Sequence, residues 1–565
     1  MPASPTIFPC GPLEKPSPAA AAGHSIPFYV LTWLAGIGLL TFAFLYALPF
    51  IPIDETRYLG VAWEMFARGD FLVPYLNGHP YHHKPPLLFW ILHAGWAIFG
   101  VNDWWPRVAS ASLSFAGVLL TARLARRLWP ETPALGGWAG TILLGTGLWA
   151  VFTAAVMFDT LLAACVLLAM NGLWDAARGQ RRAWLWVGAG IGLGVLAKGP
   201  VVLLHVLPAA LLWPWWRPEA GLPGRWYRRL ALAALGGAAI ALTWAVPAAI
   251  RGGPEYAHMI FWGQSAGRIV ESFAHRRSWW WYLPLLPLLL APWTLWPSAW
   301  RALARLRPLR EPALRFLLAW AGISFLAFCA ISGKQAHYLL PLFPAVSLLL
   351  ARALAVHGEH PSRLDRLPVL LPLAAAAALV FLRLHPPAHL PPFLANLPSW
   401  PAAALATLAI TGWLLPWRTR SAWLPTFALG TGLFLTILAL GLGRAAAPYY
   451  DVRPASRFIA QAQAEGRPVA FVGQYHDQFH FYGRLNQPIE EISWSELHVW
   501  AKEHPEGILI DTFKGMPPPE FAAPLLQQPY RGQILFIASA REIAALSHPS
   551  SPTLQPNDDV DDASE

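Results

Sequence analysis

The sequence predicts an all-α membrane protein that crosses the bilayer many times and carries a small α/β domain near its C-terminus. Of the 565 residues, 56% are hydrophobic and 13% are charged, whereas soluble domains carry about 25% charged residues. Many apolar stretches have the roughly 20 residues that cross a bilayer. After residue 444, shorter apolar stretches have the length of buried strands.

The two ends of the chain differ from the rest in composition. Residues 1–26 are rich in proline, alanine and serine, which is typical of a disordered tail. This tail lacks the basic start of a signal peptide, and the apolar stretch after it is too long for one, so we expect an uncleaved first span. Residues 546–565 are expected to form a disordered acidic tail.

The region 27–443 is predicted to be the transmembrane domain. About thirteen of its apolar stretches approach the length of a bilayer span. Their expected positions are 28–50, 107–122, 135–152, 160–176, 184–197, 200–216, 231–250, 281–299, 316–332, 339–356, 368–383, 401–417 and 423–442.

Arginines follow every second predicted span and indicate the orientation. Short arginine-rich connections lie on the cytoplasmic side of a membrane, so the N-terminus is expected inside and residues 444–545 outside. This distribution also explains the net charge of +10 without a nucleic-acid partner. The arginines concerned are Arg123, Arg126, Arg127, Arg178, Arg181, Arg182, Arg217, Arg225, Arg228, Arg229, Arg301, Arg305, Arg307, Arg310, Arg315, Arg352, Arg363, Arg366, Arg418 and Arg420.

The connections on the opposite side carry few polar residues, of both signs. Each has a structural explanation: Asp159 can cap a helix, Lys198 can anchor a span at the interface, and Arg57 can be a surface charge. Ionisable groups at membrane depth nevertheless tend to mark functional sites. Five such connections on one face predict the mouth of an active site. They are 54–84, Asp159, Lys198, 251–281 and 332–338.

The outer loop 54–106 begins where the first span ends. The stretch "DETRYLGVAWEMFARG" has an amphipathic pattern and predicts a helix along the interface. Asp54 stands where an N-cap is expected, although capping does not explain Glu55 and Arg57 beside it. Later in the loop, Asn77 and Gly78 predict a turn.

Lys84 comes directly before two prolines in the same loop. A residue that precedes proline favours an extended backbone, and Pro85 and Pro86 can open a second helix that runs through Phe99. The loop therefore holds Lys84 at a fixed place, beside His82 and His83. Adjacent histidines point in different directions, so a metal site here is the weaker interpretation.

Together these residue types suit transfer from a lipid phosphate. Arg57, Lys84 and Lys198, with Arg276 or Lys334, can neutralise a phosphate leaving group, an electrostatic role that is often large in catalysis. Asp54, or Asp159 as the second candidate, can orient or deprotonate an acceptor hydroxyl. The sequence contains no Walker A loop and no clear GxGxxG pattern, so a soluble nucleotide is not the obvious donor.

The stretch "DETRYLGVAWEMFARGDFLVPYLNGHPYHHKPPLLFW" resembles the first outer loop of GT-C glycosyltransferases that use polyprenyl-phosphate sugars. Within that group it is most similar to the lipid A aminoarabinose transferases, relatives of the protein O-mannosyltransferases. "MFDTLLAACVLLAM", "AKGPVVLLHVLPAALLW" and "SGKQAHYLLPLFPAVSLLLARAL" add support, and the resemblance covers roughly residues 30–360. It implies a thirteen-span GT-C fold with two interfacial helices and an outer C-terminal domain.

The resemblance also implies roles for single residues. Asp54 matches the family's catalytic acid, and Asp159 is a second functional acid. The resemblance implies that Arg57, Tyr58, Lys84 and Lys198 lie near the donor phosphate. Together with these four, the candidate substrate-binding residues include Glu55, Tyr81, Arg276 and Lys334.

Two positions depart from the pattern of the aminoarabinose transferases. This chain has His83 before Lys84 where those enzymes commonly carry a glutamate that is linked to a metal site. It has Gln264-Ser265 where they carry a histidine. The resemblance therefore does not carry over the metal site or lipid A as acceptor. A divalent metal stays open as a cofactor, with His83 as its candidate ligand.

The outer region 444–545 predicts a small α/β domain. "RPVAFVGQ", "GILIDTF" and "GQILFIAS" predict strands, and "PASRFIAQAQAEG" and "SELHVWAKEHPEG" predict helices. The stretch "QYHDQFHFYG" is compatible with contact to a glycan or acceptor and equally with a structural loop.

The sequence thus predicts a glycosyltransferase of a bacterial inner membrane that moves a sugar from a polyprenyl-phosphate carrier to a lipid or glycan acceptor at the periplasmic face. A protein O-mannosyltransferase-like activity is the first alternative. A transporter of lipid-linked sugars is the second, but it predicts inverted repeats and helices broken at the midplane, and the sequence shows no repeat. A receptor with an outer sensing domain would leave the residues between Asp54 and Lys84 unexplained.

Overall fold

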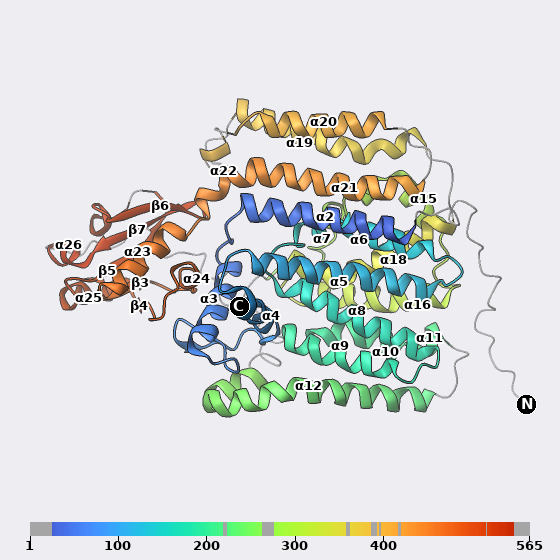
Figure 1. Cartoon of the computed structure of the whole chain (residues 1–565), viewed down its shortest axis with the longest axis horizontal. Coiled ribbons are helices and arrows are strands. Elements are labelled where there is room, and N and C mark those ends of the chain that lie inside the picture. Colours follow the sequence, from blue (N-terminus) through green and yellow to red (C-terminus); the bar gives the residue numbers. More distant parts are fainter. Residues whose placement is uncertain are drawn as a thin grey trace, which may run out of the picture.

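The protein is elongated, with a helical bundle and a small sheet domain at one end (Figure 1). We analysed a computed structural model, which describes residues 25–546 except 218–222, 263–275, 357–361, 386–391, 395–396, 416–419 and 516. The long helices lie side by side along the bundle, and the helix that begins nearest the N-terminus, α2 (Ile26–Ala47), starts at the end away from the sheet. The expected tails lie outside the described residues, except for residues 25, 26 and 546.

The bundle consists mainly of apolar helices. Those of its first half, after α2, are α5 (Trp105–Leu128), α6 (Ala134–Leu144), α7 (Gly147–Val151), α8 (Phe158–Ala177), α9 (Ala183–Lys198), α10 (Val202–Leu211), α11 (Trp213–Trp216) and α12 (Pro223–His258). Those of its second half are α14 (Leu286–Leu289), α15 (Pro297–Arg305), α16 (Pro312–Leu317), α17 (Ile323–Ala330), α18 (Phe343–Val356), α19 (Leu370–Leu384), α20 (Trp400–Leu414), α21 (Arg420–Leu438) and α22 (Arg444–Ala446).

Within the described residues, nine helices are long and apolar enough to cross a membrane, and three apolar helices are shorter. The prediction of a polytopic helical membrane protein is therefore confirmed, while the count of thirteen spans stays a prediction. Helix α8 is buried over most of its length, so it occupies the interior of the bundle. Gly199, with φ 75°, is in the left-handed region that favours glycine, and there α9 turns back into α10.

The expected span 281–299 is not one continuous helix. It contains turns, the short helix α14, and a 3₁₀ turn at Trp293–Leu295, before α15 begins at Pro297. Four prolines lie in this stretch, and each lacks the N–H that a continuous helix requires. The span count from hydropathy alone misses this break because proline scarcely changes the mean hydropathy.

The first outer loop forms the layer between the bundle and the sheet domain (Figure 1). Its two expected helices are present as α3 (Asp54–Arg68) and α4 (Leu87–Phe99). Between them a hairpin pairs β1 (Tyr75–Leu76) with β2 (His79–Pro80). Its turn residues Asn77 and Gly78 have φ 49° and 83°, as a type I′ hairpin turn requires.

The C-terminal region folds as a five-stranded mixed sheet in the order β4-β3-β5-β7-β6. Its central strands have the apolar sequences that predicted them, while the edge strands β4 and β6 were not expected. The elements are α23 (Arg453–Ala464), β3 (Val469–Val472), α24 (His480–Gly483), β4 (Glu490–Ile492), α25 (Leu497–Glu503), β5 (Ile508–Phe513), β6 (Leu526–Tyr530), β7 (Gln533–Ser539) and α26 (Ala540–Ala544). β3 is parallel to β4 and β5, and β7 is antiparallel to β5 and β6.

Candidate active site

Asp54 is the first residue of α3 and does not cap it. The N-cap position is Ile53, and no side chain makes a capping hydrogen bond there. Asp54 Oδ1 instead accepts a hydrogen bond from an Arg57 guanidinium nitrogen at 2.8 Å. The Asp54 side chain is 52% exposed, whereas that of Arg57 is 8% exposed. The structural explanation by capping therefore fails, and the acid remains accessible beside a buried cation.

Two tyrosines surround Arg57 on its inner side. The Arg57 guanidinium lies 5.7 Å from the centroid of the Tyr58 ring, and it also interacts electrostatically with Tyr81. Burial and the negative charge of Asp54 raise the pKa of Tyr58 well above its usual range. Tyr58 is therefore a neutral phenol, and its ring packs edge-on against Phe158 at 4.9 Å, one residue before Asp159.

Asp159, which is buried, and Lys198, which is half-buried, form an ion pair where three helix ends meet. Lys198 Nζ lies 2.7 Å from Asp159 Oδ1, and His337 Nε2 lies 3.9 Å from Asp159 Oδ2. Lys198 Nζ is also 4.5 Å from the centroid of the Tyr338 ring. Because Asp159 makes no capping hydrogen bond at the start of α8, its structural explanation fails as well.

Lys84 joins this group from the first outer loop. It is 8% exposed, and its charge acts on both Asp159 and His337. The structure thus brings together most of the residues that the sequence singled out. They are Asp54, Arg57, Tyr58, Tyr81, Lys84, Asp159 and Lys198.

The ion pair predicts that Lys198 contributes to stability, as the partner of Asp159, as well as to activity. In Lys198→Met, the buried Asp159 loses its nearest positive partner, and breaking such a pair costs up to about 3–5 kcal/mol of stability when both groups are buried. We expect a melting temperature well below wild type by thermal unfolding of the purified protein. Adding Asp159→Asn should restore the melting temperature but not the activity. Equal stability of Lys198→Met and wild type would contradict the pairing.

Three predicted site residues lie apart from this group. Glu55 is buried and accepts hydrogen bonds from the backbone N–H groups of Ile51 and Val156 at 2.9 and 2.8 Å, and it pairs with Arg107 at 3.4 Å. It therefore attaches α3 to the neighbouring helices.

Lys334, the second of these residues, is held by backbone carbonyls. Lys334 Nζ donates to the Arg277 carbonyl at 3.1 Å and also to the Ile331 carbonyl.

The third of these residues, Arg276, is exposed and forms a backbone bridge with Gly333. The first part of the outer loop 251–281 belongs to α12, which extends to His258. Residues 263–275 of the loop lie outside the described part of the chain. Substrate contacts by Glu55, Arg276 and Lys334 stay predictions.

His83, the candidate metal ligand, stacks on Tyr81 with ring centroids 5.2 Å apart. Among the described residues it belongs to no group of three histidine, cysteine or carboxylate side chains close enough to hold a metal. Gln264 and Ser265 lie outside the described residues. A divalent ion at His83 therefore stays a prediction.

The sequence analysis missed two histidines of this site. His337 was noticed only as part of the polar stretch 332–338. His476 belongs to "QYHDQFHFYG" in the C-terminal domain, more than four hundred residues from Arg57 in sequence. Burial and the positive charge of Arg57 lower the pKa of His476 to about 4. A neutral imidazole from the sheet domain thus lies within electrostatic reach of Arg57.

The C-terminal domain docks on one face of α3. Arg57, Gly60 and Glu64 share this face because they are three and four residues apart. A Cβ added at Gly60 would lie 2.7 Å from Asp477 Oδ2 and 2.8 Å from the Asp477 carbonyl oxygen, so only glycine allows this approach. The Asn77 backbone N–H donates to Asp477 Oδ1 at 3.1 Å, which ties the hairpin to the same carboxylate.

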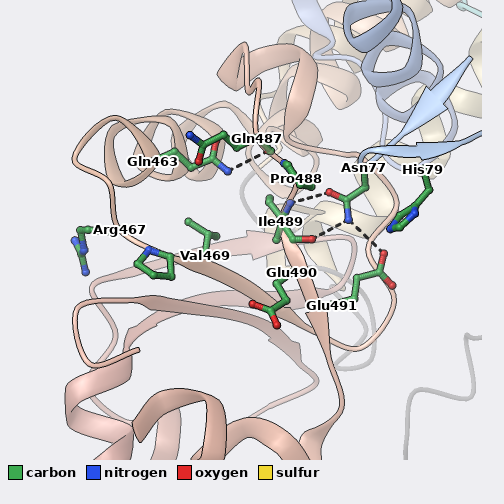
Figure 2. A pocket seen from close by; sticks show the side chains of 11 residues that line it. Asn77, His79, Gln463, Arg467, Val469, Gln487, Pro488, Ile489, Glu490 and Glu491 are labelled. Atoms are coloured by element: carbon green, nitrogen blue, oxygen red, sulfur yellow. Dashed lines mark hydrogen bonds between the residues drawn. The ribbon is translucent and has the colours of Figure 1, made fainter. Parts of the chain in front are cut away.

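Figure 2 shows the second contact between the hairpin and the sheet domain. The Asn77 side chain donates to the Ile489 carbonyl and accepts from the Ile489 N–H, both at 2.8 Å. A cavity of about 660 Å³ opens beside this contact. It is lined by Asn77, His79, Gln463, Arg467, Pro468, Val469, Gln487, Pro488, Ile489, Glu490 and Glu491.

Gly60→Ala should loosen this docking. The added methyl group has no space against Asp477, and forcing one into a packed contact costs about 1–3 kcal/mol. We expect a lower melting temperature and faster cleavage between α21 and α23 in limited proteolysis. Gly38→Ala in α2 is the matched control, since a Cβ there meets no atom within 4 Å. Identical behaviour of the two variants would contradict the contact.

Comparison with known proteins shows to which family this chain belongs. Residues 83–250 match the family model described as dolichyl-phosphate-mannose-protein mannosyltransferase. The undecaprenyl phosphate-alpha-4-amino-4-deoxy-L-arabinose arabinosyl transferase of Pseudomonas paraeruginosa is 32% identical over 418 residues, which cover 69% of this chain and 73% of that protein. The chain belongs to this arabinosyl transferase family.

Other members of the family agree in length and fold. Transferase 2 of Pseudomonas fluorescens is 28% identical over 465 residues, covering 76% of this chain and 77% of that protein. The crystal structure of ArnT from Cupriavidus metallidurans bound to undecaprenyl phosphate superposes with a TM-score of 0.73 at 21% identity, over 93% of this chain and all of that chain. The protein is therefore a membrane glycosyltransferase with the GT-C fold, as its first outer loop predicted.

Proposed function

We propose that this protein transfers a glycosyl unit from an undecaprenyl-phosphate-linked donor to a lipid or glycan acceptor at the periplasmic face of a bacterial inner membrane. The observation that carries the proposal is the group formed by Lys84, the Asp159–Lys198 pair and the Asp54–Arg57 pair. It lies at the end of the bundle that faces the sheet domain (Figure 1). The names of the relatives and the lipid bound to ArnT support the same donor.

In the proposed reaction, the acceptor oxygen attacks the anomeric carbon of the donor sugar. The bond between that carbon and the phosphate oxygen breaks, and the lipid phosphate leaves with the electron pair. Arg57, Lys84 and Lys198 stabilise the negative charge on the leaving phosphate. Asp54 orients the acceptor hydroxyl and takes its proton. With a phosphate acceptor no base is required, and Asp54 then acts by positioning alone.

The orientation in the membrane follows from the arginines. The connections at the end away from the sheet carry most of them, and Arg123 there pairs with Asp175 at 2.8 Å. By the positive-inside rule, this distribution supports a cytoplasmic N-terminus and a periplasmic sheet domain.

Cysteine labelling in intact cells tests this orientation. Exposed positions at the two ends are Lys502 and Arg225. With Cys10 replaced by serine, a membrane-impermeant maleimide should label Lys502→Cys and not Arg225→Cys. The reverse pattern would overturn the orientation and with it the periplasmic site.

The transfer itself is tested with purified protein and defined donors. Undecaprenyl phosphate carrying 4-amino-4-deoxy-L-arabinose or a hexose is supplied with envelope lipids, glycans and proteins as acceptors, and products are followed by mass spectrometry. We expect transfer of one of these sugars to a lipid or glycan. The matched family model is described by protein mannosylation, so sugar on a protein acceptor instead would favour the protein O-mannosyltransferase-like alternative. No product from any lipid-phosphate donor would overturn the proposal.

A further inference from the structure

A second cluster of ionisable side chains lies between α3 and the sheet domain. It consists of Glu64 from α3 and Asp477 and His480 from the C-terminal region, with one ligand-type atom of each within 4.8 Å of the others. The three side chains are 5%, 0% and 1% exposed. In the sequence the two halves of the cluster are about four hundred residues apart, so only the fold brings them together.

Each of the two carboxylates of this cluster has one basic partner, Arg68 for Glu64 and His480 for Asp477. Two buried carboxylates need cations or hydrogen bonds, because burying an uncompensated charge costs several kcal/mol. Glu64 accepts from Arg68 at 3.2 Å and from the Gly78 N–H at 3.1 Å. Asp477 Oδ1 accepts from Asn77 and lies 2.8 Å from His480 Nδ1.

The second carboxylate oxygen of Asp477 gives evidence for a ligand that does not depend on the clustering of the three side chains. Asp477 Oδ2 is buried and has no hydrogen-bond partner among the described residues. It lies against α3 at Gly60, one helical turn before Glu64. The Asp477 side chain itself is fully buried. This oxygen therefore lacks the hydrogen-bond partner that buried polar atoms normally have.

We propose that Glu64, Asp477 and His480 bind a divalent transition-metal ion such as Zn²⁺. Carboxylate and imidazole ligands suit this class of metal. Four-coordinate zinc with bonds of about 2.0–2.2 Å holds its ligand atoms roughly 3.3–3.6 Å apart, so the three ligand atoms, which lie within 4.8 Å of one another, would move closer together on binding. A divalent ion also neutralises both carboxylates with His480 uncharged.

The surroundings of the cluster fit a metal with an access path. A hydrogen bond to the backbone of Gln487 holds the His480 ring, as backbone groups commonly orient metal-bound histidines. A cavity of about 220 Å³ borders Glu64 and His480, so water can enter and complete the coordination. The bound metal fastens the sheet domain to the helix that carries Asp54 and Arg57.

The experiment uses the full chain in detergent, stripped with a chelator and titrated with Zn²⁺ alone. After desalting, we expect about one zinc per chain by elemental analysis and a higher melting temperature at saturating zinc, since a ligand of the folded state stabilises it by mass action. Glu64→Gln and His480→Gln should each weaken zinc binding at least about tenfold, because even the loss of an outer-shell partner costs that much.

Three further variants separate the explanations. His504→Gln, in the same domain but outside the cluster, is the matched control and should bind zinc like wild type. Asp477→Asn keeps the shape of the side chain, so it should fold even where another variant does not, and it should also weaken zinc binding. His83→Gln tests the first outer loop as the metal site. If this variant loses zinc binding while the Glu64 and His480 variants keep it, the metal lies at His83 and the proposal is overturned.

A stripped wild-type protein that takes up no zinc would also overturn the proposal, and the cluster would then be a hydrogen-bonded ion network. Neither readout uses a sugar donor. The zinc site and the proposed transfer activity can therefore fail independently.

Discussion

Asp54→Asn should reduce sugar transfer by about two orders of magnitude or more, the usual effect of losing a positioned base, while the melting temperature stays near that of wild type. The amide keeps the size of the side chain but cannot take a proton. No capping hydrogen bond is lost, because Asp54 makes none at the start of α3.

Asp103→Asn is the matched control for this prediction. Asp103 also lies in the first outer loop, pairs with an arginine, Arg484, at 3.3 Å, and is 53% exposed against 52% for Asp54. It should leave the transfer rate unchanged. An active Asp54→Asn protein would reduce Asp54 to a surface partner of Arg57. Equal losses in both variants would point to a general effect of outer-face charge.

Lys84→Met should reduce transfer by about two to three orders of magnitude, as expected for one oriented group that stabilises developing charge. Methionine keeps most of the length of the stem and removes the ammonium group. Arg57→Met should have an effect of similar size. The measurement is the rate of transfer from a defined undecaprenyl-phosphate sugar by purified variants, with melting temperatures to confirm folding.

Lys502→Met, an exposed lysine of the sheet domain, is the control for loss of one positive charge. Wild-type rates for Lys84→Met and Arg57→Met would return both residues to structural roles. A weaker effect of Lys84→Met at saturating donor than at low donor would show that Lys84 acts mainly in binding rather than in the transition state.

The first outer loop was the most predictable part of the structure. Its two helices and its hairpin turn follow from local signals: the amphipathic pattern after Asp54, the Asn77-Gly78 pair and the two prolines after Lys84. The grouping of Asp159 and Lys198 with this loop followed from counting spans, because alternate helix ends must face the same side of the membrane.

Other features lay beyond the sequence because they depend on contacts between distant segments. The break in 281–299 results from prolines, which hydropathy does not detect. The sequence did not reveal the partners of Glu55: one step along the helix from Asp54 turns its side chain inward, to Arg107. No periodic pattern connects Glu64 with His480, so their meeting depends on how the sheet domain docks.

The shared face of α3 limits how this enzyme can be recombined. The same few turns of helix meet the sheet domain at Gly60 and Glu64 and contribute Arg57 to the candidate site. A chimera that takes residues 444–546 from a relative while retaining the native α3 would pair surfaces that were never selected together. Exchange of the sheet domain between family members therefore requires α3, its hairpin and the sheet domain to be transferred together.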